Sequence, residues 1–230
     1  MPEPRVVLRK TSLVDYPPFI SGVLFFPGCN LRCPWCHNRD LVLPAPGGGP
    51  PGSIGLSRAL AGLEKRRGLL GGVVISGGEP TLYPALADLI ARIRELGLKV
   101  KLDTNGLRPG VLEGLFAAPQ TSPDYIALDL KTAPERYVEL LPPEPAASPV
   151  PGGENRGRFA GGTPGAALRR SAALIRASGG AHEFRSLELP GGYFTAGDRA
   201  ALAELAGDSP WKIRPFIPGG CLDPAWDRIA

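Results

Sequence analysis

The sequence that decides the fold is FPGCNLRCPWCHN, residues 26–38, which directly follows the short apolar run 22–26. It holds Cys29, Cys33 and Cys36, three of the four cysteines of the chain. A disulfide framework spreads its cysteines along a chain, whereas tight clustering favours a metal site. Three thiolates can hold an iron–sulfur cube and leave one iron open, as a catalytic metal centre requires.

A structural zinc site is the alternative for these cysteines. Structural zinc needs four closed ligands, so the fourth would have to be His37 or Cys221. His37 adjoins Cys36, which makes simultaneous ligation awkward, and Cys221 is distant in sequence and is expected to be a free thiol. The spacing favours the cube and leaves zinc open.

Outward from this loop, short apolar runs alternate with amphipathic segments of helical period. The runs that predict buried strands are 22–26, 73–76, 99–103, 125–129, 183–189 and 211–216. The segments that predict helices are 56–67, 84–96, 109–117, 165–177 and 196–206. Pro84 and Pro109 suit the first turn of their helices, where a missing N–H costs nothing.

This alternation predicts an α/β fold with a parallel sheet and right-handed crossovers. An eight-fold barrel needs about 250 residues. This chain has 230, and two of its stretches, 44–55 and 142–164, are rich in Gly and Pro. We therefore expect a partial (β/α)6 barrel that is laterally open, with its site at the C-terminal ends of the strands. The stretch 142–164 is expected as a flexible loop insertion in a single domain of residues 1–230.

Polar residues follow the predicted second and third strands. Gly77 and Gly78 let the backbone approach a ligand closely, and Glu79 offers a carboxylate acceptor. An ordinary turn is the alternative for this segment, and also for Asn105-Gly106.

Charged residues mark the ends of the next two strands. Asp129 and Lys131 project to the same side if the strand continues, with a surface ion pair as the alternative. Arg185 lies in a mostly apolar strand and needs an anionic partner if it is buried. A carboxylate suits its forked guanidinium best.

With Trp35 before the last cysteine, the Cys-x3-Cys-x2-Cys spacing resembles the signature of the radical S-adenosylmethionine (SAM) superfamily. The resemblance extends over nearly the whole chain, which is similar to the glycyl-radical-enzyme activating proteins. Among these, the chain most resembles the activating proteins of anaerobic ribonucleoside-triphosphate reductase. The stretches that carry it are KTSLVDYPPFISGVLFFPGCNLRCPWCHN, VVISGGEPTL, KLDTNG, DYIALDLK and HEFRS.

The resemblance implies a 4Fe–4S cluster on the three cysteines, reductive cleavage of SAM to a 5′-deoxyadenosyl radical, and a glycyl radical made on a partner enzyme. It also implies an electron donor of flavodoxin or ferredoxin type. The residues that it places in catalysis or beside SAM are Cys29, Cys33, Cys36, Lys131, Trp35, Gly77, Gly78, Glu79, Asp103, Thr104, Asp129 and Arg185.

Within this set, the resemblance assigns individual roles. Glu79 and its glycines would bind the SAM amino group, and Arg185 its carboxylate. Asp103 and Thr104 would also suit a monovalent cation. Two departures stand out: Ser186-Leu187 replaces a frequent Thr-Thr pair, and Ile217 stands where pyruvate formate-lyase activating enzyme has a SAM-contacting His. The second argues against pyruvate formate-lyase as the partner.

Other functions remain as alternatives. A small-molecule radical SAM enzyme such as 7-carboxy-7-deazaguanine synthase shares Gly-Cys-Asn-x-x-Cys, but Cys-His-Asn in place of Cys-Asp-Thr weighs against it. An activase of another glycyl radical enzyme is a second alternative. A non-catalytic iron–sulfur or zinc module is the third, and it would not need the motifs at the strand ends.

Composition sets the remaining expectations. The net charge of +4 permits an acidic partner, but the basic residues are scattered, so no nucleic-acid partner is expected. No apolar run approaches the roughly 20 residues that span a bilayer, and MPEPRVVLRKTS lacks the apolar core of a signal peptide. We therefore expect no membrane association and a cytoplasmic location.

Overall fold

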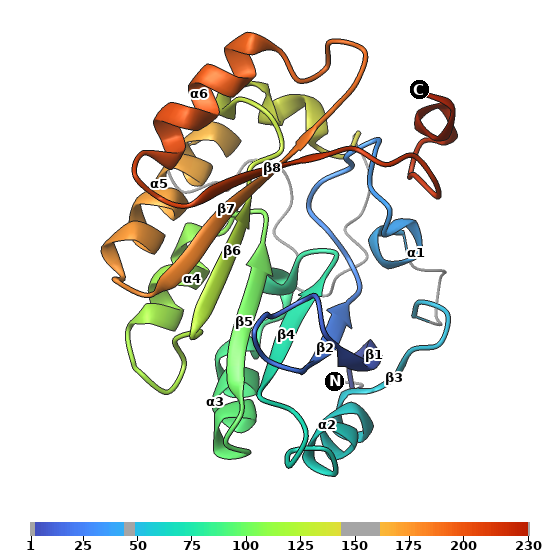
Figure 1. Ribbon diagram of the computed structural model, residues 1–230, viewed down its shortest axis with the longest axis vertical. Coiled ribbons are helices and arrows are strands. Elements are labelled where there is room, and N and C mark those ends of the chain that lie inside the picture. The colour runs from blue at the N-terminus through green and yellow to red at the C-terminus, as the bar shows by residue number, and fades with distance from the viewer. Residues whose placement is uncertain (1–2, 44–48, 144–161, 230) are drawn as a thin grey trace.

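The computed structural model describes residues 3–43, 49–143 and 162–229. Its strands form one sheet in the order β3-β1-β2-β4-β5-β6-β7-β8 (Figure 1). The strands are β1 (Arg5–Ser12), β2 (Ser21–Phe26), β3 (Ile54–Gly55), β4 (Gly72–Gly77), β5 (Lys99–Thr104), β6 (Tyr125–Asp129), β7 (Ala181–Glu188) and β8 (Trp211–Pro215). Every pair from β2 to β8 is parallel, which confirms the predicted parallel strands.

Helices connect these strands, and all of them except the short α1 cover one face of the sheet (Figure 1). The α-helices are α1 (Arg39–Val42), α2 (Leu56–Glu64), α3 (Leu86–Glu95), α4 (Pro109–Phe116), α5 (Pro164–Ala177) and α6 (Ala196–Ala206). Shorter 3₁₀ turns cover Pro80–Leu82, Pro134–Leu140 and Pro224–Arg228. None of the described helices combines the length and the apolar character needed to cross a membrane.

The two faces of the sheet differ in chemistry. Leu24, Ile75 and Leu102 are aligned across β2, β4 and β5 and are fully buried in the main core. Because side chains alternate along a strand, the residues that follow them point to the opposite face. In β4 and β5 those residues are Ser76 and Asp103. The polar residues thus lie away from the apolar core, at the C-terminal ends of their strands.

The sheet stays open at its sides. Its two end strands, β3 and β8, are not paired with each other in the described part of the chain, so the strands form a partial barrel as expected. The insertion predicted at 142–164 falls mostly on residues 144–161, outside the described residues.

Two features differ from the sequence expectations. The sheet extends beyond β2 through the antiparallel strands β1 and β3, which the apolar runs did not predict. Pro84 lies outside α3, whose N-cap is Ala85, because the preceding residues are held in the buried 3₁₀ turn Pro80–Leu82. Pro109 occupies the first turn of α4 as predicted.

Candidate functional site

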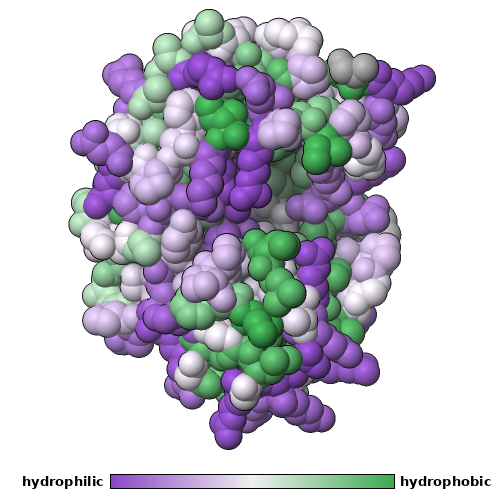
Figure 2. Space-filling model, viewed as in Figure 1, coloured by the Kyte–Doolittle hydropathy of each residue, from purple (hydrophilic) through white to green (hydrophobic). Residues whose placement is uncertain are grey.

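A cavity of about 270 Å³ lies at the C-terminal ends of the parallel strands. Figure 2 shows a hollow bordered by hydrophilic residues in this region. Every site residue expected from the sequence lines the cavity, from the cysteine loop (residues 26–38) to Arg185. The residues that also line it, and were not expected, are Leu31, His37, Asn38, Val42, Ser76, Asn105 and Leu187.

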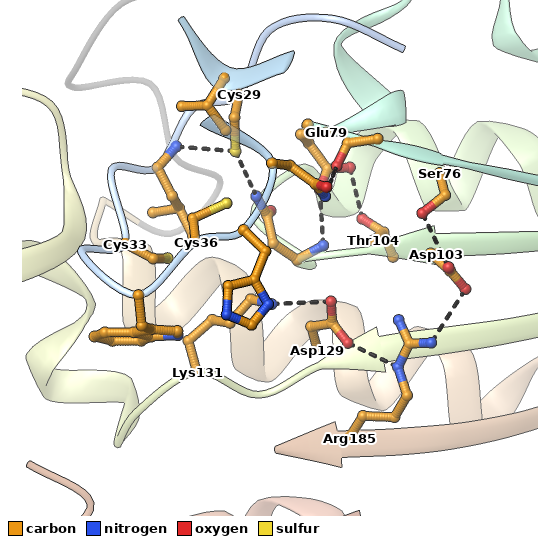
Figure 3. A pocket seen from close by; sticks show the side chains of 18 of the residues that line it. Cys29, Cys33, Cys36, Ser76, Glu79, Asp103, Thr104, Asp129, Lys131 and Arg185 are labelled. Carbon is orange, nitrogen blue, oxygen red and sulfur yellow. Dashed lines mark hydrogen bonds and ion pairs between the residues drawn. The ribbon is translucent and has the colours of Figure 1, made fainter. Parts of the chain in front are cut away.

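The cysteine loop presents its three sulfur atoms to one side of the cavity (Figure 3). Internal hydrogen bonds fix its shape: the Cys36 N–H donates to the Cys33 carbonyl at 3.0 Å. Arg32 Nη1 donates to the carbonyls of Cys29 and Leu31 at 2.7 and 2.8 Å. The chain itself thus supplies hydrogen bonds that help to fix the curvature of the loop.

The protonation of the thiols bears on what they can hold. Burial raises the pKa of the Cys33 thiol to about 12, although nearby Lys131 acts to lower it. Burial also raises the pKa of Cys29, and the charge of Glu79 adds to this effect. A coordinated metal deprotonates its thiol ligands outright and supplies the compensating positive charge. The donor set therefore fits a metal centre.

The arrangement of the thiols suits a cube better than a single ion. In the described residues, no three His, Cys, Asp or Glu side chains gather closely enough to hold one metal ion. Tetrahedral zinc, with Zn–S of about 2.3 Å, needs sulfur atoms within about 4 Å of one another. A four-iron cube takes one thiolate at each of three corners, so its ligands lie farther apart.

Gly77 and Gly78 bring the end of β4 against the backbone of the cysteine loop. A Cβ added to Gly78 would lie 1.9 Å from the carbonyl oxygen of Gly28, and Gly77 has a φ of +124°. The N–H of Gly78 donates to Phe26 O, and that of Glu79 to Gly28 O, both at 2.8 Å. The glycines are thus needed for a close approach between two segments of this chain, before any ligand is considered.

The carboxylate of Glu79 joins the ends of β4 and β5. Oε1 accepts hydrogen bonds from Thr81 N (3.1 Å), Thr81 Oγ1 (2.6 Å) and Thr104 Oγ1 (2.8 Å). Oε2 accepts one from Asn105 N at 2.7 Å. Since a carboxylate has about four lone-pair sites, Oε2 keeps acceptor capacity toward the cavity.

Charged side chains form the opposite wall of the cavity (Figure 3). Asp129 accepts from Arg185 Nε at 2.8 Å and from Lys131 Nζ at 2.9 Å. Burial acts to raise the pKa of Asp129, but Arg185 and Lys131 together hold it well below its usual range. Burial acts to lower the pKa of Lys131, and the charge of Asp129 raises it overall. Both groups of this pair are therefore ionised at neutral pH.

Asp103 does not offer a ready cation site. Its Oδ2 accepts from Ser76 Oγ at 3.0 Å. Its buried Oδ1 has no hydrogen-bond partner in the described part of the chain, but Lys101 Nζ and Arg185 Nη1 each lie 3.5 Å away. Because two cationic side chains already face this oxygen, the structure gives the expected monovalent cation no support.

Two asparagines, Asn38 and Asn105, connect the cysteine loop to the strand ends, and neither was among the site residues expected from the sequence. Asn105 Nδ2 donates to Asn30 Oδ1 at 2.7 Å and lies 3.9 Å from Cys29 Sγ. Asn38 Nδ2 donates to the Gly77 carbonyl at 3.0 Å. Both contacts join residues far apart in sequence, so a short motif cannot reveal them.

The residues that depart from the expected pattern lie at different depths. Ser186 is buried, and its hydroxyl donates to the Leu130 carbonyl at 2.8 Å. Leu187 lines the cavity, whereas Ile217 is 70% exposed and does not. Cys221 is a buried free cysteine that does not line the cavity.

Known proteins share this arrangement of sequence and fold. The family model of the Radical SAM superfamily matches residues 23–147, more than half of the chain. A solved structure of SuiB from Streptococcus suis is similar in fold, with a TM-score of 0.56 at 17% identity, over 90% of this chain and 43% of that one.

Three curated relatives match the chain in part. A candidate glycyl-radical enzyme activating enzyme of Methanocaldococcus jannaschii is 37% identical, over 56% of this chain and 51% of its own length. The pyruvate formate-lyase-activating enzyme of Clostridium pasteurianum is 36% identical, over 54% and 50%. The 7-carboxy-7-deazaguanine synthase of Hyperthermus butylicus is 42% identical, over 46% and 44%. The chain thus spans about half the length of the curated relatives that it matches.

Proposed function

The chain belongs to the radical SAM superfamily, and from this premise we propose that it cleaves SAM reductively and activates a glycyl radical enzyme. The observation that carries the proposal is that three thiols, the Gly-Gly-Glu end of β4 and the ion pair of Arg185 with Asp129 all line one cavity. On this proposal, residues 1–230 form one radical SAM domain.

Cys29, Cys33 and Cys36 would hold a 4Fe–4S cluster, and one iron would stay free for SAM. When bound, the cluster and SAM would together supply methionine and a 5′-deoxyadenosyl radical through one-electron cleavage of the sulfonium. The part of the chain itself is to bind, orient and exclude side reactions. Trp35, only 3% exposed, shields one side of the loop from water.

The far wall of the cavity suits the amino acid part of SAM. Arg185 presents a guanidinium that can pair with a carboxylate, and Asp129 holds it in place through Nε at 2.8 Å. The free capacity of Glu79 Oε2 suits the SAM ammonium. Lys131, ionised by its contact with Asp129, belongs to the same charged wall and would face the reacting region (Figure 3).

The proposed protein substrate rests on the relatives. One is named as a candidate glycyl-radical enzyme activating enzyme and another as a pyruvate formate-lyase-activating enzyme. The motif resemblance described above favours anaerobic ribonucleoside-triphosphate reductase as the partner, with a flavodoxin or ferredoxin as the electron donor. The sheet, open at its sides, leaves room for a loop of a partner to reach the cavity.

A small-molecule reaction is the second candidate, because the Hyperthermus butylicus synthase is 42% identical over 110 residues. The deciding experiment incubates the reconstituted protein anaerobically with SAM, a strong reductant and the class III reductase. Electron paramagnetic resonance should show a protein radical doublet, absent when the C-terminal glycine of the reductase is replaced by alanine. The Cys33→Ala variant is the matched control and should give neither SAM cleavage nor radical.

Two results would contradict the proposal in different ways. SAM cleavage with conversion of a pterin, but no protein radical on any glycyl radical enzyme, would favour the small-molecule reaction. Failure to cleave SAM in a protein that holds its full complement of iron would refute the radical SAM activity itself.

A further inference from the structure

The C-terminal segment, residues 219–229, lies against the cysteine loop although the two are separated by most of the chain. The N–H of Leu222 donates to the carbonyl of Cys36, and the N–H of Asp223 to that of Pro34, both at 2.9 Å. Figure 1 shows this C-terminal turn beside the segment that follows β2. The segment thus makes two backbone hydrogen bonds to the stretch that carries Cys36.

Aromatic side chains extend this contact. The ring of Trp226 lies 5.2 Å from that of Trp35, 5.3 Å from Tyr193 and 5.7 Å from Phe216. Trp35 and Tyr193 are in turn 5.0 Å apart. Trp226 is 8% exposed although it lies four residues from the end of the chain. Together these rings pack around Trp35 of the cysteine loop.

The segment holds its own shape. Asp227 Oδ1 accepts from the N–H of Cys221 at 2.8 Å, and Asp223 caps the 3₁₀ turn through a bond from Ala225 N at 2.9 Å. Cys221, which precedes this turn, is 2% exposed. The segment is thus held by its own side chains and by two backbone hydrogen bonds to the cysteine loop.

We propose that residues 219–229 are a clamp on the iron–sulfur cluster: they fix Cys36 through its carbonyl and keep water from the flank beside Trp35. The inference rests on the proposed three-cysteine cluster and concerns residues outside the matched range 23–147. The solvent exposure and the surrounding shell of a cluster set its reduction potential and its access to solvent. The clamp therefore controls how firmly iron is held and how readily the cluster is reduced.

The test uses the full chain with its cluster reconstituted anaerobically, and two separate variants. Leu222→Pro deletes the donor to the Cys36 carbonyl, since proline has no N–H. Trp226→Ala removes the ring that covers Trp35, and Trp226→Phe restores a ring in the same place. Arg228→Ala is the matched control, because Arg228 is exposed in the same 3₁₀ turn.

Three quantities are measured: iron release to a ferrous chelator, the midpoint potential of the cluster, and the thermal midpoint of the iron-free protein. Leu222→Pro should release iron about tenfold faster, as expected for the loss of one well-formed hydrogen bond. Trp226→Ala should raise the midpoint potential, because admitted water stabilises the more negative reduced form. Trp226→Phe and Arg228→Ala should match the wild type in iron release and in midpoint potential.

The outcomes separate the clamp from the proposed function. Wild-type protein that binds no cluster overturns both. If the wild type binds its cluster, and Leu222→Pro and Trp226→Ala have the same iron release and midpoint potential as the wild type, the clamp alone is overturned. If Leu222→Pro fails to fold, the two Trp226 variants decide. A midpoint potential that shifts in Trp226→Ala but not in Trp226→Phe, while both iron-free variants have the same thermal midpoint, supports the clamp over a general loss of stability.

Discussion

Removing the Glu79 side chain should destabilise the whole protein as well as weaken SAM binding. In Glu79→Ala, two buried backbone donors, Thr81 N and Asn105 N, lose their acceptor. The two threonine hydroxyls that also bond Glu79 can rotate to other partners. A buried donor without an acceptor costs about 1–3 kcal/mol, so the loss should be roughly 2–6 kcal/mol. That is a large share of the roughly 5–15 kcal/mol that stabilises a typical domain.

The isosteric variant sharpens this prediction. In Glu79→Gln, the amide oxygen can keep the donors of Oε1, but its NH₂ group faces the N–H of Asn105, so only about half of the loss is expected, roughly 1–3 kcal/mol. The assay is urea unfolding of the iron-free proteins, followed by far-ultraviolet circular dichroism. Glu95→Ala, at an exposed site in α3, is the matched control and should unfold as the wild type.

The order wild type, Gln, Ala in unfolding free energy would support the structural role of Glu79. Equal stability of Glu79→Ala and Glu95→Ala would refute the reasoning. A Gln variant that is nearly as stable as the wild type, yet binds SAM at least about tenfold more weakly, would separate direct contact with SAM from positioning of the strand ends.

Three further predictions follow from the site and its supports. Cys29→Ala should lose the cluster while Cys221→Ala keeps about four irons, measured by iron analysis after anaerobic reconstitution; loss of iron in the second would require another ligand set. Arg185→Lys should weaken SAM binding about tenfold, measured by calorimetry, because lysine lacks the forked donors of arginine; an unchanged affinity would mean that the SAM carboxylate does not bind Arg185. Asp198→Asn should flatten the pH dependence of unfolding: although burial acts to raise it, hydrogen bonds from Thr195 and others lower the pKa of Asp198 to about 2. Ionised Asp198 therefore adds about 2–3 kcal/mol to the free energy of unfolding above its unfolded pKa of roughly 3.9, and this contribution is lost as the pH falls toward 2. If the unfolding free energy of the wild type does not fall faster, as the pH is lowered, than that of Asp198→Asn, the prediction is wrong.

Local patterns predicted the central parallel strands β2, β4 and β6 because most of their residues are buried and form short apolar runs. The strand 125–129 and the helix 196–206 have the predicted bounds. The strand β1 was missed because its burial is mixed and five of its eight residues, Arg5 and those from Arg9 to Ser12, are polar. Its partner β3 is only two residues long, and its pairing is set by β1 rather than by its own composition.

The candidate site was predictable where side chains with special chemistry sit at strand ends. All of the expected residues line one cavity, and their individual roles remain predictions. The reason for Gly77 and Gly78 was not predictable, since it depends on the backbone of Phe26 and of Gly28, respectively, far away in the sequence. The anchors supplied by Asn105 and Leu222 were missed for the same reason: one is a long-range side-chain bond and the other a backbone bond, and neither leaves a sequence pattern.

The anchoring of the cysteine loop has a consequence for biosynthesis. Its backbone is bonded to Leu41, Leu140 and Leu222, positions spread over most of the chain. Such contacts close long loops and form late in folding. During translation the three thiols are made well before Leu222, so the loop lacks this anchor while the growing chain is still short of it. Until residue 222 has joined the fold, the backbone of the loop is incompletely held, and its three thiols are more open to oxidation than in the folded chain.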